Sequence, residues 1–233
     1  MGPNMTAVEV IDPRQPNSVG VGVVAFYHPG HNEPCDDMCQ APFLGNFYED
    51  PEEKVTLDGQ TFRNAEGAFQ ALKFWQHAPQ FSALDGESVF RLKKQLEAAG
   101  KADRGYHGYG SNWKGMLAVL RAKFKRSSKY EERLLATADT FLLEHNSIEG
   151  RDSVWSNNHV GDGKNWLGMQ LMLVRDELQS GPLSFFTGPR PWTRFIRDVC
   201  KINLETGQPR DSSGAGTWSR LVQEATDEVL NRL

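Results

Sequence analysis

The helical spacing of apolar residues is the feature of this sequence that most restricts its fold. Between Asn112 and Phe124, apolar side chains share one stripe of a helix, while Lys114 and Arg121 fall on the opposite face. The same period recurs elsewhere and predicts helices over residues 64–77, 88–99, 130–138, 166–180, 191–202 and 217–233. Helices therefore account for most of the predicted structure.

Short strands complete the predicted fold. We expect a buried strand over residues 20–27 and a second short strand over residues 140–144. Residues 54–62 predict a hairpin, because Asp58 and Gly59 form a dipeptide that favours a tight two-residue turn. The sequence thus predicts an α+β fold that is predominantly helical.

Length and composition favour one main domain with additions at both ends. The chain has 233 residues, of which 39% are hydrophobic and 24% charged, as in an ordinary globular protein. Residues 1–19 contain three prolines and little hydrophobicity, so we expect a flexible leader there. Residues 20–182 are expected to form the main domain, and residues 183–233 a C-terminal helical extension packed on it.

Charge and hydropathy indicate the cellular compartment of the protein and the kinds of partner it has. A net charge of −4 gives no overall basic field, and the basic run of residues 121–133 is typical of the solvated face of a helix. No secretory signal and no apolar stretch long enough to cross a bilayer are visible. We therefore expect an intracellular protein, cytoplasmic or nuclear, that has no membrane partner.

The cysteine pattern does not predict a disulfide framework or a metal site. The chain has three cysteines, and two of them lie near histidines in a polar segment, residues 28–42, that we expect to be a loop. A zinc site there would use His28, His31, Cys35 and Cys39. The spacings are not those of a zinc knuckle, and no second knuckle follows. We expect no metal and no cofactor.

One polar stripe on the helix expected after Asn64 has two interpretations. At about 100° per residue, its members lie within an arc of roughly 60°, and they are Glu66, Gln70, Lys73 and His77. The stripe is either a solvated face, with its glutamate stabilised by the helix dipole, or polar chemistry between aromatic walls such as Phe69. Periodicity alone favours the solvated face.

Two further residues and one loop are candidates for chemistry. Trp113 aligns with the apolar stripe of its helix and is predicted to be core, while Lys123 lies at the border of that stripe. Residues 145–164 form a long polar loop that contains Asp152 and Trp155. Its last turn leads into a helix and either binds phosphate through backbone amides or is a plain capped loop; it consists of Gly161, Asp162, Gly163, Lys164 and Asn165.

Several motifs occur in the order found in a known family. They are FLGNFY, AEGAFQALKFW, NWKGMLAVLRAKF, LLATADTFLLE and RDSVW followed by GDGKNWLGMQLMLVR, within residues 43–178. This series resembles the NADAR family, named for NAD and ADP-ribose, which includes the YbiA-like proteins. Two departures are that Gly45 fills the small position before Asn-Phe-Tyr, and that Ser156 follows Trp155 where the family has glycine.

The resemblance implies an N-glycosidase, so the main domain is expected to be catalytic. One branch of the family removes ADP-ribose from guanine bases of nucleic acid, and another cleaves phosphoribosylamino-pyrimidine intermediates of riboflavin synthesis. We expect the first activity, with guanine in DNA or RNA as the partner bearing ADP-ribose; the second activity and a non-catalytic ADP-ribose reader are the alternatives. The basic run and Arg190, Arg194 and Arg197 mildly favour a large anionic substrate.

The resemblance also implies roles for individual residues. Glu66 is expected to stabilise the charge on the ribose or to activate water, and Asp152 to act as a second carboxylate and proton donor. Either Lys73 or Lys123 is expected to contact phosphate; in a rival mechanism a lysine such as Lys73 forms an imine at C1. The predicted substrate-binding residues are Asn46, Phe47, Phe69, Gln70, Trp113, Lys123, Trp155, Gly161, Asp162, Gly163 and Asn165.

Overall fold

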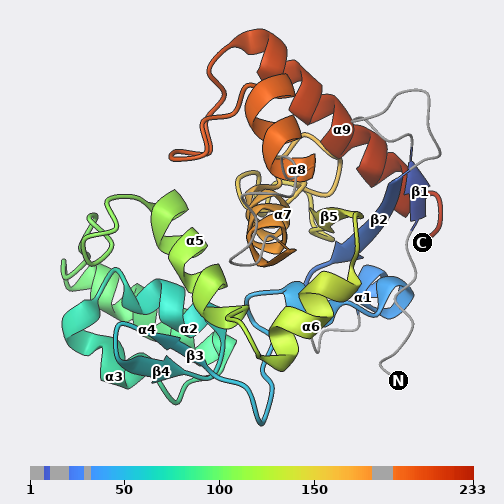
Figure 1. Cartoon of the computed structure of the whole chain (residues 1–233). Coiled ribbons are helices and arrows are strands. Elements are labelled where there is room, and N and C mark those ends of the chain that lie inside the picture. The colour runs from blue at the N-terminus through green and yellow to red at the C-terminus, as the bar shows by residue number, and fades with distance from the viewer. Residues whose placement is uncertain (1–7, 11–20, 29–32, 180–190) are drawn as a thin grey trace. The chain divides into compact units, whose positions relative to one another are not determined.

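The chain divides into two compact units. The structure is a computed structural model that describes residues 8–10, 21–28, 33–179 and 191–233. The larger unit combines Met1–Gly45 with Arg133–Leu233, and the smaller unit is the continuous stretch Asn46–Glu132 (Figure 1). The smaller unit is thus an insertion in the sequence of the larger one. The predicted domain boundaries at residues 19 and 182 stay a prediction.

A three-stranded mixed sheet lies at the centre of the larger unit. Its order is β1-β2-β5, in which β2 (Val21–Phe26) is central between β1 (Val8–Val10) and β5 (Phe141–Glu144). β1 runs antiparallel to β2, whereas β5 runs parallel to it. Strand β2 is almost wholly buried, which explains its continuous apolar run. The two predicted strands are confirmed, but β1 lies within the segment expected to be a flexible leader.

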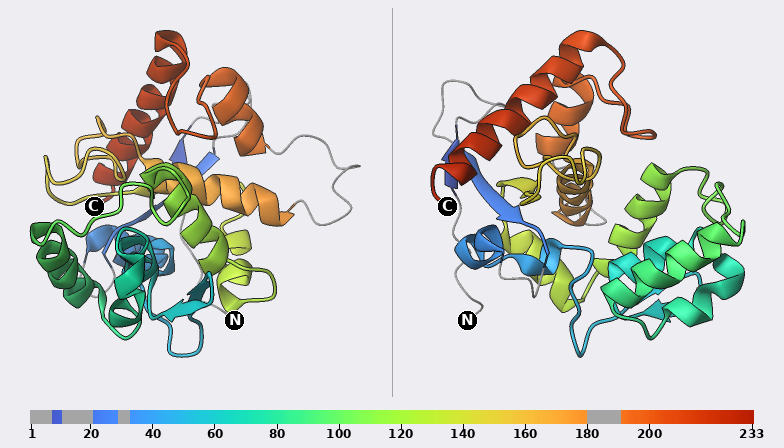
Figure 2. Two further views of the ribbon diagram at one scale, coloured as in Figure 1. Left: turned by 90° about the vertical axis from the view of Figure 1, so that its left-hand side faces the viewer. Right: turned by 180° about the vertical axis from the view of Figure 1, so that it is seen from behind.

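Helices cover the sheet of the larger unit. Helix α7 (Trp166–Gln179) packs against β5, and α9 (Ser212–Leu230) lies along the strands, as the two views of Figure 2 show. Short helical segments surround them, namely α1 (Pro34–Cys39), the 3-10 turn Pro42–Leu44, α8 (Pro191–Arg194) and the π-helical turn Phe195–Val199. Helix α6 (Lys129–Ala136) spans the point at which the sequence returns to the larger unit.

The larger unit has an aromatic core that ties its C-terminal helices to the sheet. Phe141 on β5 contacts both Trp192 on α8 and Trp218 on α9, with ring centroids 5.7 and 5.6 Å apart. The indole nitrogen of Trp192 also donates to the carbonyl of Asp139 at 3.0 Å. Burial of rings of this size is a large apolar contribution to stability.

The smaller unit packs helices on a β-hairpin. Strands β3 (Val55–Leu57) and β4 (Gln60–Phe62) pair across Asp58 and Gly59, whose φ angles of 47° and 81° are those of the predicted tight turn. The helices are α2 (Ala65–Ala71), the 3-10 turn Trp75–His77, α3 (Ala78–Phe81), α4 (Gly86–Ala98) and α5 (Asn112–Lys123). Helix α2 contacts α3, α4, α5 and the hairpin, so every residue of α2 is buried.

Three predicted boundaries are wrong. The segment expected to be a loop, residues 28–42, contains α1, which begins at Pro34. Helix α2 ends at Ala71 instead of continuing to His77. The helix predicted over residues 217–233 begins earlier, at Ser212, and Asp211 caps its first turn by accepting from the amide of Gly214 at 2.8 Å. The α+β, predominantly helical class is confirmed.

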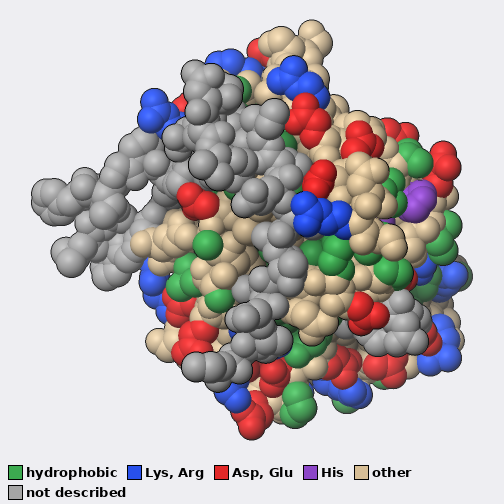
Figure 3. Space-filling view, turned by 90° about the vertical axis from the view of Figure 1, so that its right-hand side faces the viewer, with side chains coloured by type: hydrophobic (Ala, Val, Ile, Leu, Met, Phe, Trp, Pro, Cys, Tyr) green, Lys and Arg blue, Asp and Glu red, His purple; other side chains and the backbone are tan. Residues whose placement is uncertain are grey.

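Surface features agree with an ordinary globular chain. On the face drawn in Figure 3, acidic, basic and hydrophobic side chains of the described residues are interspersed. Within the described part of the chain, no helix is long and apolar enough to cross a membrane. The predicted compartment stays a prediction.

Candidate active site

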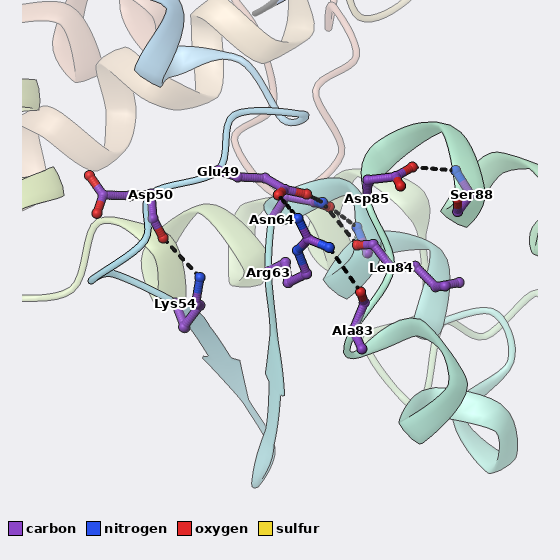
Figure 4. A network of polar contacts seen from close by, with 10 residues as sticks. Glu49, Asp50, Lys54, Arg63, Asn64, Ala83, Leu84, Asp85 and Ser88 are labelled. Carbon is purple, nitrogen blue, oxygen red and sulfur yellow. Dashed lines mark hydrogen bonds and ion pairs between the residues drawn. The ribbon is translucent and has the colours of Figure 1, made fainter.

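The start of α2 is fixed by a buried cap. Asn64 has extended backbone dihedrals, and its side-chain oxygen accepts from the amide of Gly67 at 2.7 Å, as expected of an N-cap. Its side-chain nitrogen donates to Glu49 at 2.8 Å and to the carbonyl of Leu84 at 3.3 Å (Figure 4). One side chain therefore anchors the helix start to two other segments of the smaller unit.

Neighbouring bonds reinforce this anchor. Arg63 pairs with Glu49 and donates to the carbonyl of Ala83 at 3.2 Å. Asp85 caps α4 by accepting from the amide of Ser88 at 2.8 Å, and Figure 4 draws all these residues around the same turn. Glu66, two residues after the cap, therefore lies on a backbone that these bonds hold in place.

Three of the four residues of the predicted polar stripe form a hydrogen-bond relay, whereas His77 bonds to Gln80 instead. Gln70 donates its side-chain nitrogen to Oε1 of Glu66 at 2.8 Å, and its side-chain oxygen accepts from Nζ of Lys73 at 2.8 Å. Glu66 is only 8% exposed and Gln70 only 6%. The solvated-face interpretation is therefore wrong for these residues, although Lys73 reaches the relay from the turn that follows α2.

Aromatic rings flank the amine end of the relay. Phe69 stacks on Tyr106 with centroids 5.8 Å apart, and Nζ of Lys73 lies 5.2 Å from the Phe69 centroid and 5.8 Å from the Tyr106 centroid. Burial lowers the pKa of Lys73, the positive charge of Lys93 lowers it further, and Glu66 opposes the shift. The amine is thus more readily neutral than an exposed lysine.

Asn46 and Phe47 lie beside the start of the same helix. The carbonyl of Asn46 accepts from the amide of Glu66 at 2.9 Å. The side-chain oxygen of Asn46 is buried and has no hydrogen-bond partner among the described residues. Phe47 packs its ring against Gly86, where any side chain would collide with it. Asn46 therefore presents an unused acceptor next to the glutamate.

Trp113 and Lys123 lie within the packed interior of the smaller unit. Each is only 1% exposed. The prediction that Trp113 belongs to the apolar stripe is confirmed. The ammonium of Lys123 lies 5.1 Å from the centroid of Phe124 and 5.3 Å from that of Tyr130, so it rests on two aromatic faces.

In the larger unit, Asp152 organises the first half of the long loop. Its Oδ1 accepts from the amides of Val154 and Trp155 at 2.8 and 2.9 Å. Its carbonyl accepts from the hydroxyl of Ser156 at 2.6 Å. Trp155 is half-buried and meets Trp166 edge to face, with centroids 5.7 Å apart. The loop thus holds a carboxylate and a tryptophan in a defined turn.

The second half of the loop does not offer the amides predicted to bind phosphate. The amides of Gly161 and Gly163 both donate to the carbonyl of Asn157, at 3.0 and 3.1 Å. The amide of Asn165 donates to the carbonyl of Ser156 at 3.0 Å. The first amides of α7 are likewise bonded to carbonyls of the loop. Phosphate binding through these amides would require breaking bonds already made, so the structure does not support it.

Asp162 and Asn165 serve the loop itself. Oδ1 of Asp162 accepts from the side chain of Asn158 at 2.9 Å. Asn165 precedes α7 in the position of a cap, but its side chain accepts from the amide of Glu144 at 3.0 Å and donates to the carbonyl of Leu142 at 2.9 Å. Its φ of 47° is also left-handed instead of the extended value of a cap. It joins the loop to β5.

Comparison with known proteins decides the family. The sequence model described as NADAR domain matches residues 26–179, which is more than half of the chain. The chain belongs to the NADAR domain family. The match includes every predicted site residue and ends before α8 and α9.

Relatives of this NADAR chain include two kinds of bacterial protein. A riboflavin biosynthesis protein of Vibrio vulnificus is 32% identical over 159 residues, or 67% of this chain, but the match spans only 38% of that protein. The N-glycosidase YbiA of Escherichia coli is 31% identical over 139 residues, 58% of this chain and 81% of YbiA. The NMR structure of E. coli YbiA is similar with a TM-score of 0.53 and 25% identity, covering 69% of this chain and 87% of YbiA.

The cysteines near the N-terminus of the NADAR match serve packing. Cys39 accepts from the amide of Ala25 at 3.3 Å, and Cys35 donates to the carbonyl of His145. Burial raises the pKa of both thiols, which disfavours the thiolate form that a zinc ion would need. No group of three potential ligands exists in the described ranges, and His31 lies outside them.

Sequence reasoning missed Tyr106 and His145. Tyr106 reaches the relay from a glycine-rich turn in which its φ is 51°, and no periodicity marks such a position. His145 follows β5 and accepts at Nδ1 from the side chain of Asn157 at 2.9 Å. Burial lowers the pKa of His145 to about 4. The position of both residues depends on contacts between segments distant in the sequence.

Proposed function

We propose that this NADAR protein is an N-glycosidase that hydrolyses the ribose C1–N bond of ADP-ribosylated guanine and releases ADP-ribose. The observation that carries the proposal is the relay of Glu66, Gln70 and Lys73, in which the carboxylate and the amide are buried and the first residue follows the N-cap of α2. Relatives named N-glycosidase YbiA support the bond type. The identity of the base as guanine and of the released sugar as ADP-ribose belongs to our proposal.

The carboxylate end of the relay fits direct hydrolysis. As the C1–N bond breaks, the sugar develops positive charge, and a buried carboxylate stabilises that charge more than an exposed one would. Glu66 would orient a water molecule and take its proton while oxygen bonds to C1. The electron pair of the broken bond stays on the guanine nitrogen, which then takes a proton.

The amine end of the relay fits a second route. In this route the ribose ring first opens, which leaves an imine between C1 and the guanine nitrogen. The neutral amine of Lys73 then adds to C1, and the guanine nitrogen leaves with a proton. Water then hydrolyses the lysine imine and restores the amine. The lowered pKa of Lys73 favours this route, because only the neutral amine is nucleophilic.

Other residues would hold the substrate. The unused side-chain oxygen of Asn46 is suited to accept a hydrogen bond from a ribose hydroxyl. The Phe69 and Tyr106 pair offers an aromatic surface next to the amine. In the larger unit, Trp155 is suited to stack on a base, and Asp152, whose Oδ1 is committed to the loop, would act through Oδ2.

Some of the basic residues that would attract a nucleic-acid substrate are paired with acidic side chains. Arg121 and Lys125 of the predicted basic run are exposed, but Lys129 pairs with Glu52 and Arg126 with Glu131. Arg197 pairs with Asp198 beside it, and Arg190 lies outside the described residues. The relative named for riboflavin biosynthesis keeps a phosphoribosylamino-pyrimidine as the second candidate substrate.

The test compares two substrates with three proteins. An oligonucleotide carrying ADP-ribose on guanine and a phosphoribosylamino-pyrimidine are each incubated with the wild type, Glu66→Gln and Glu87→Gln. Glu87 is a matched control, because it is also in the first turn of a helix but is exposed on α4. Products are identified by mass spectrometry.

We expect the wild type and Glu87→Gln to release free ADP-ribose from the oligonucleotide, and Glu66→Gln to be slower by roughly a hundredfold or more. Turnover of the pyrimidine alone would assign the protein to the second candidate substrate. Binding of ADP-ribose without cleavage of either compound would show a reader and contradict the proposed activity.

A further inference from the structure

We infer that the segment after the NADAR match, above all α9, is a brace that positions the long loop carrying Asp152 and Trp155. The brace consists of Gly207, Trp218, Gln223 and Thr226, all beyond residue 179, where the match ends. The inference concerns positioning residues and rests on the proposed function only in taking that loop to be part of the active site.

The first contact of the brace joins Thr226 to Asn157. Thr226 and Asn157 are both 0% exposed. The side-chain nitrogen of Asn157 donates to the hydroxyl of Thr226 at 2.9 Å, and that hydroxyl donates to the carbonyl of Val222 within α9. The threonine hydroxyl is thus fixed as an acceptor for the loop, because its own proton is used inside the helix.

Asn157 is the hub of the loop. Its side-chain oxygen accepts from the amides of Asn146 and His159, each at 3.1 Å, and its carbonyl accepts from those of Gly161 and Gly163. Its own amide donates to the carbonyl of Glu144 at 2.9 Å. A single residue therefore ties both halves of the loop to β5, and α9 holds that residue.

The second contact of the brace acts at the end of the loop. The indole nitrogen of Trp218 donates to the carbonyl of Lys164 at 2.8 Å. Trp166, the first residue of α7, donates its indole nitrogen to the carbonyl of Gly207 at 3.1 Å. Trp166 is also the ring that Trp155 meets edge to face. The brace therefore bonds to Trp166, whose ring contacts Trp155, a proposed substrate-binding residue.

The third contact is steric. The side chain of Gln223 lies so close to Gly161 that a Cβ placed there would be 2.8 Å from it. Figure 2 shows the loop, drawn in yellow and gold, beside α9 in both views. From Thr226 the connection continues through Asn157 to the adjacent Ser156, whose hydroxyl bonds the carbonyl of Asp152 at 2.6 Å. The position of Asp152 thus depends on α9.

The test uses pairs of variants that separate hydrogen bonding from packing. Thr226→Val keeps the shape and loses the hydroxyl, whereas Thr226→Ser keeps the hydroxyl and loses a methyl group. Thr217→Val is the matched control on the same helix, since among the described residues the hydroxyl of Thr217 bonds only the carbonyl of Ser213. Trp218→Phe is compared with Trp192→Phe, because Trp192 donates to Asp139 and not to the loop.

Two measurements are made on the wild type and on each variant. Hydrogen exchange followed by mass spectrometry reports the order of residues 145–165 without any substrate, and steady-state kinetics reports kcat and KM. We expect Thr226→Val and Trp218→Phe to exchange about five- to tenfold faster in this loop and to lose a similar factor in kcat/KM. Thr226→Ser should stay near the wild type.

The outcomes distinguish the brace from the proposed activity. If all proteins lack glycosidase activity but exchange in the loop rises only in Thr226→Val and Trp218→Phe, the proposed function fails and the brace stands. If exchange in these two variants matches that of their controls, or if Thr226→Ser is as disturbed as Thr226→Val, the brace is wrong.

Discussion

At the scale of single residues, the smaller unit buries groups that ordinarily stay in water. Glu66 and Gln70 are almost fully buried, and the amine of Lys73 donates to the side-chain oxygen of Gln70 and lies near aromatic rings. Such groups remain buried only when their hydrogen bonds are satisfied. Gln70 satisfies both neighbours because its amide donates at one end and accepts at the other.

Removing the central amide tests whether the relay acts as a unit. Gln70→Met keeps the length of the side chain and removes both hydrogen bonds, so the carboxylate and the amine lose their common orientation. We expect kcat of the glycosidase reaction to fall about tenfold or more, with a smaller change in KM. Gln95→Met, at an exposed glutamine of α4, is the control, and an equal loss in both variants would contradict a role for the relay.

The charge of Lys93 offers a test of the amine. Lys93 lowers the pKa of Lys73, so Lys93→Gln should raise that pKa. If Lys73 reacts as the neutral amine, the pH at which the rate rises should move to higher pH in this variant. Lys94→Gln removes an exposed neighbouring charge and should leave the profile in place. Unchanged pH profiles in both variants would favour direct hydrolysis.

At the scale of elements, the two asparagines that precede α2 and α7 differ in function. Asn64 has an extended backbone and caps α2, whereas Asn165 is left-handed and bonds to β5. The sequence places an asparagine before a helix in both cases, so it predicts a cap in both. The difference arises from β5, a strand whose position relative to α7 no local pattern specifies.

The same contrast explains the other successes and failures of prediction. The hairpin followed from Asp58 and Gly59, because a turn of two residues is specified locally. The start of α9 was predicted five residues too late, at residue 217, because glycine is a poor helix former and Gly214 and Gly216 lie in its first turns. Gly214 is instead required by packing, since a Cβ there would collide with the carbonyl of Cys200. The residues of the relay were found by periodicity, but their burial depends on α4 and α5.

Helix α2 should depend strongly on its cap. Asn64→Ala removes the buried bond to Gly67 and also the part-buried bonds to Glu49 and Leu84, so we expect a loss of about 2 kcal/mol or more in the free energy of unfolding. Asp85→Ala removes the exposed cap of α4 and should cost about 1 kcal/mol. Urea unfolding measures both. Equal losses would mean that the network of Figure 4 adds nothing to the cap.

The long loop should make stability depend on pH. His145 has a pKa near 4 when folded, below its ordinary value of 6.5, so the unfolded chain binds more protons between these values. Stability from this group is complete above about pH 6.5 and falls towards pH 4, by up to about 3 kcal/mol. His145→Gln should flatten this part of the profile in urea unfolding. An identical slope in wild type and variant would contradict the assignment.

At the scale of the whole molecule, the two units differ in a way that chemistry can report. All three cysteines are buried in the larger unit, and the stretch Asn46–Glu132 contains none. Burial raises the pKa of Cys200 to about 12 and also raises those of Cys35 and Cys39. Thiol labelling therefore reports opening of the larger unit alone.

We expect the native protein to react slowly with a thiol reagent at pH 8 and all three cysteines to react at once in denaturant. At intermediate urea, labelling should follow the unfolding of the larger unit. Rapid labelling of the native protein would show that the thiols are accessible and would contradict their buried placement.

The pairing of β2 with β5 has a consequence for synthesis on the ribosome. Val23 pairs with Phe141, and the whole smaller unit is translated between them. At the usual rates of elongation, the apolar strand β2 waits on the order of ten seconds for its parallel partner, with one edge unpaired. Nascent chains of this protein are therefore expected to need a chaperone over that interval, until β5 leaves the exit tunnel and closes the sheet.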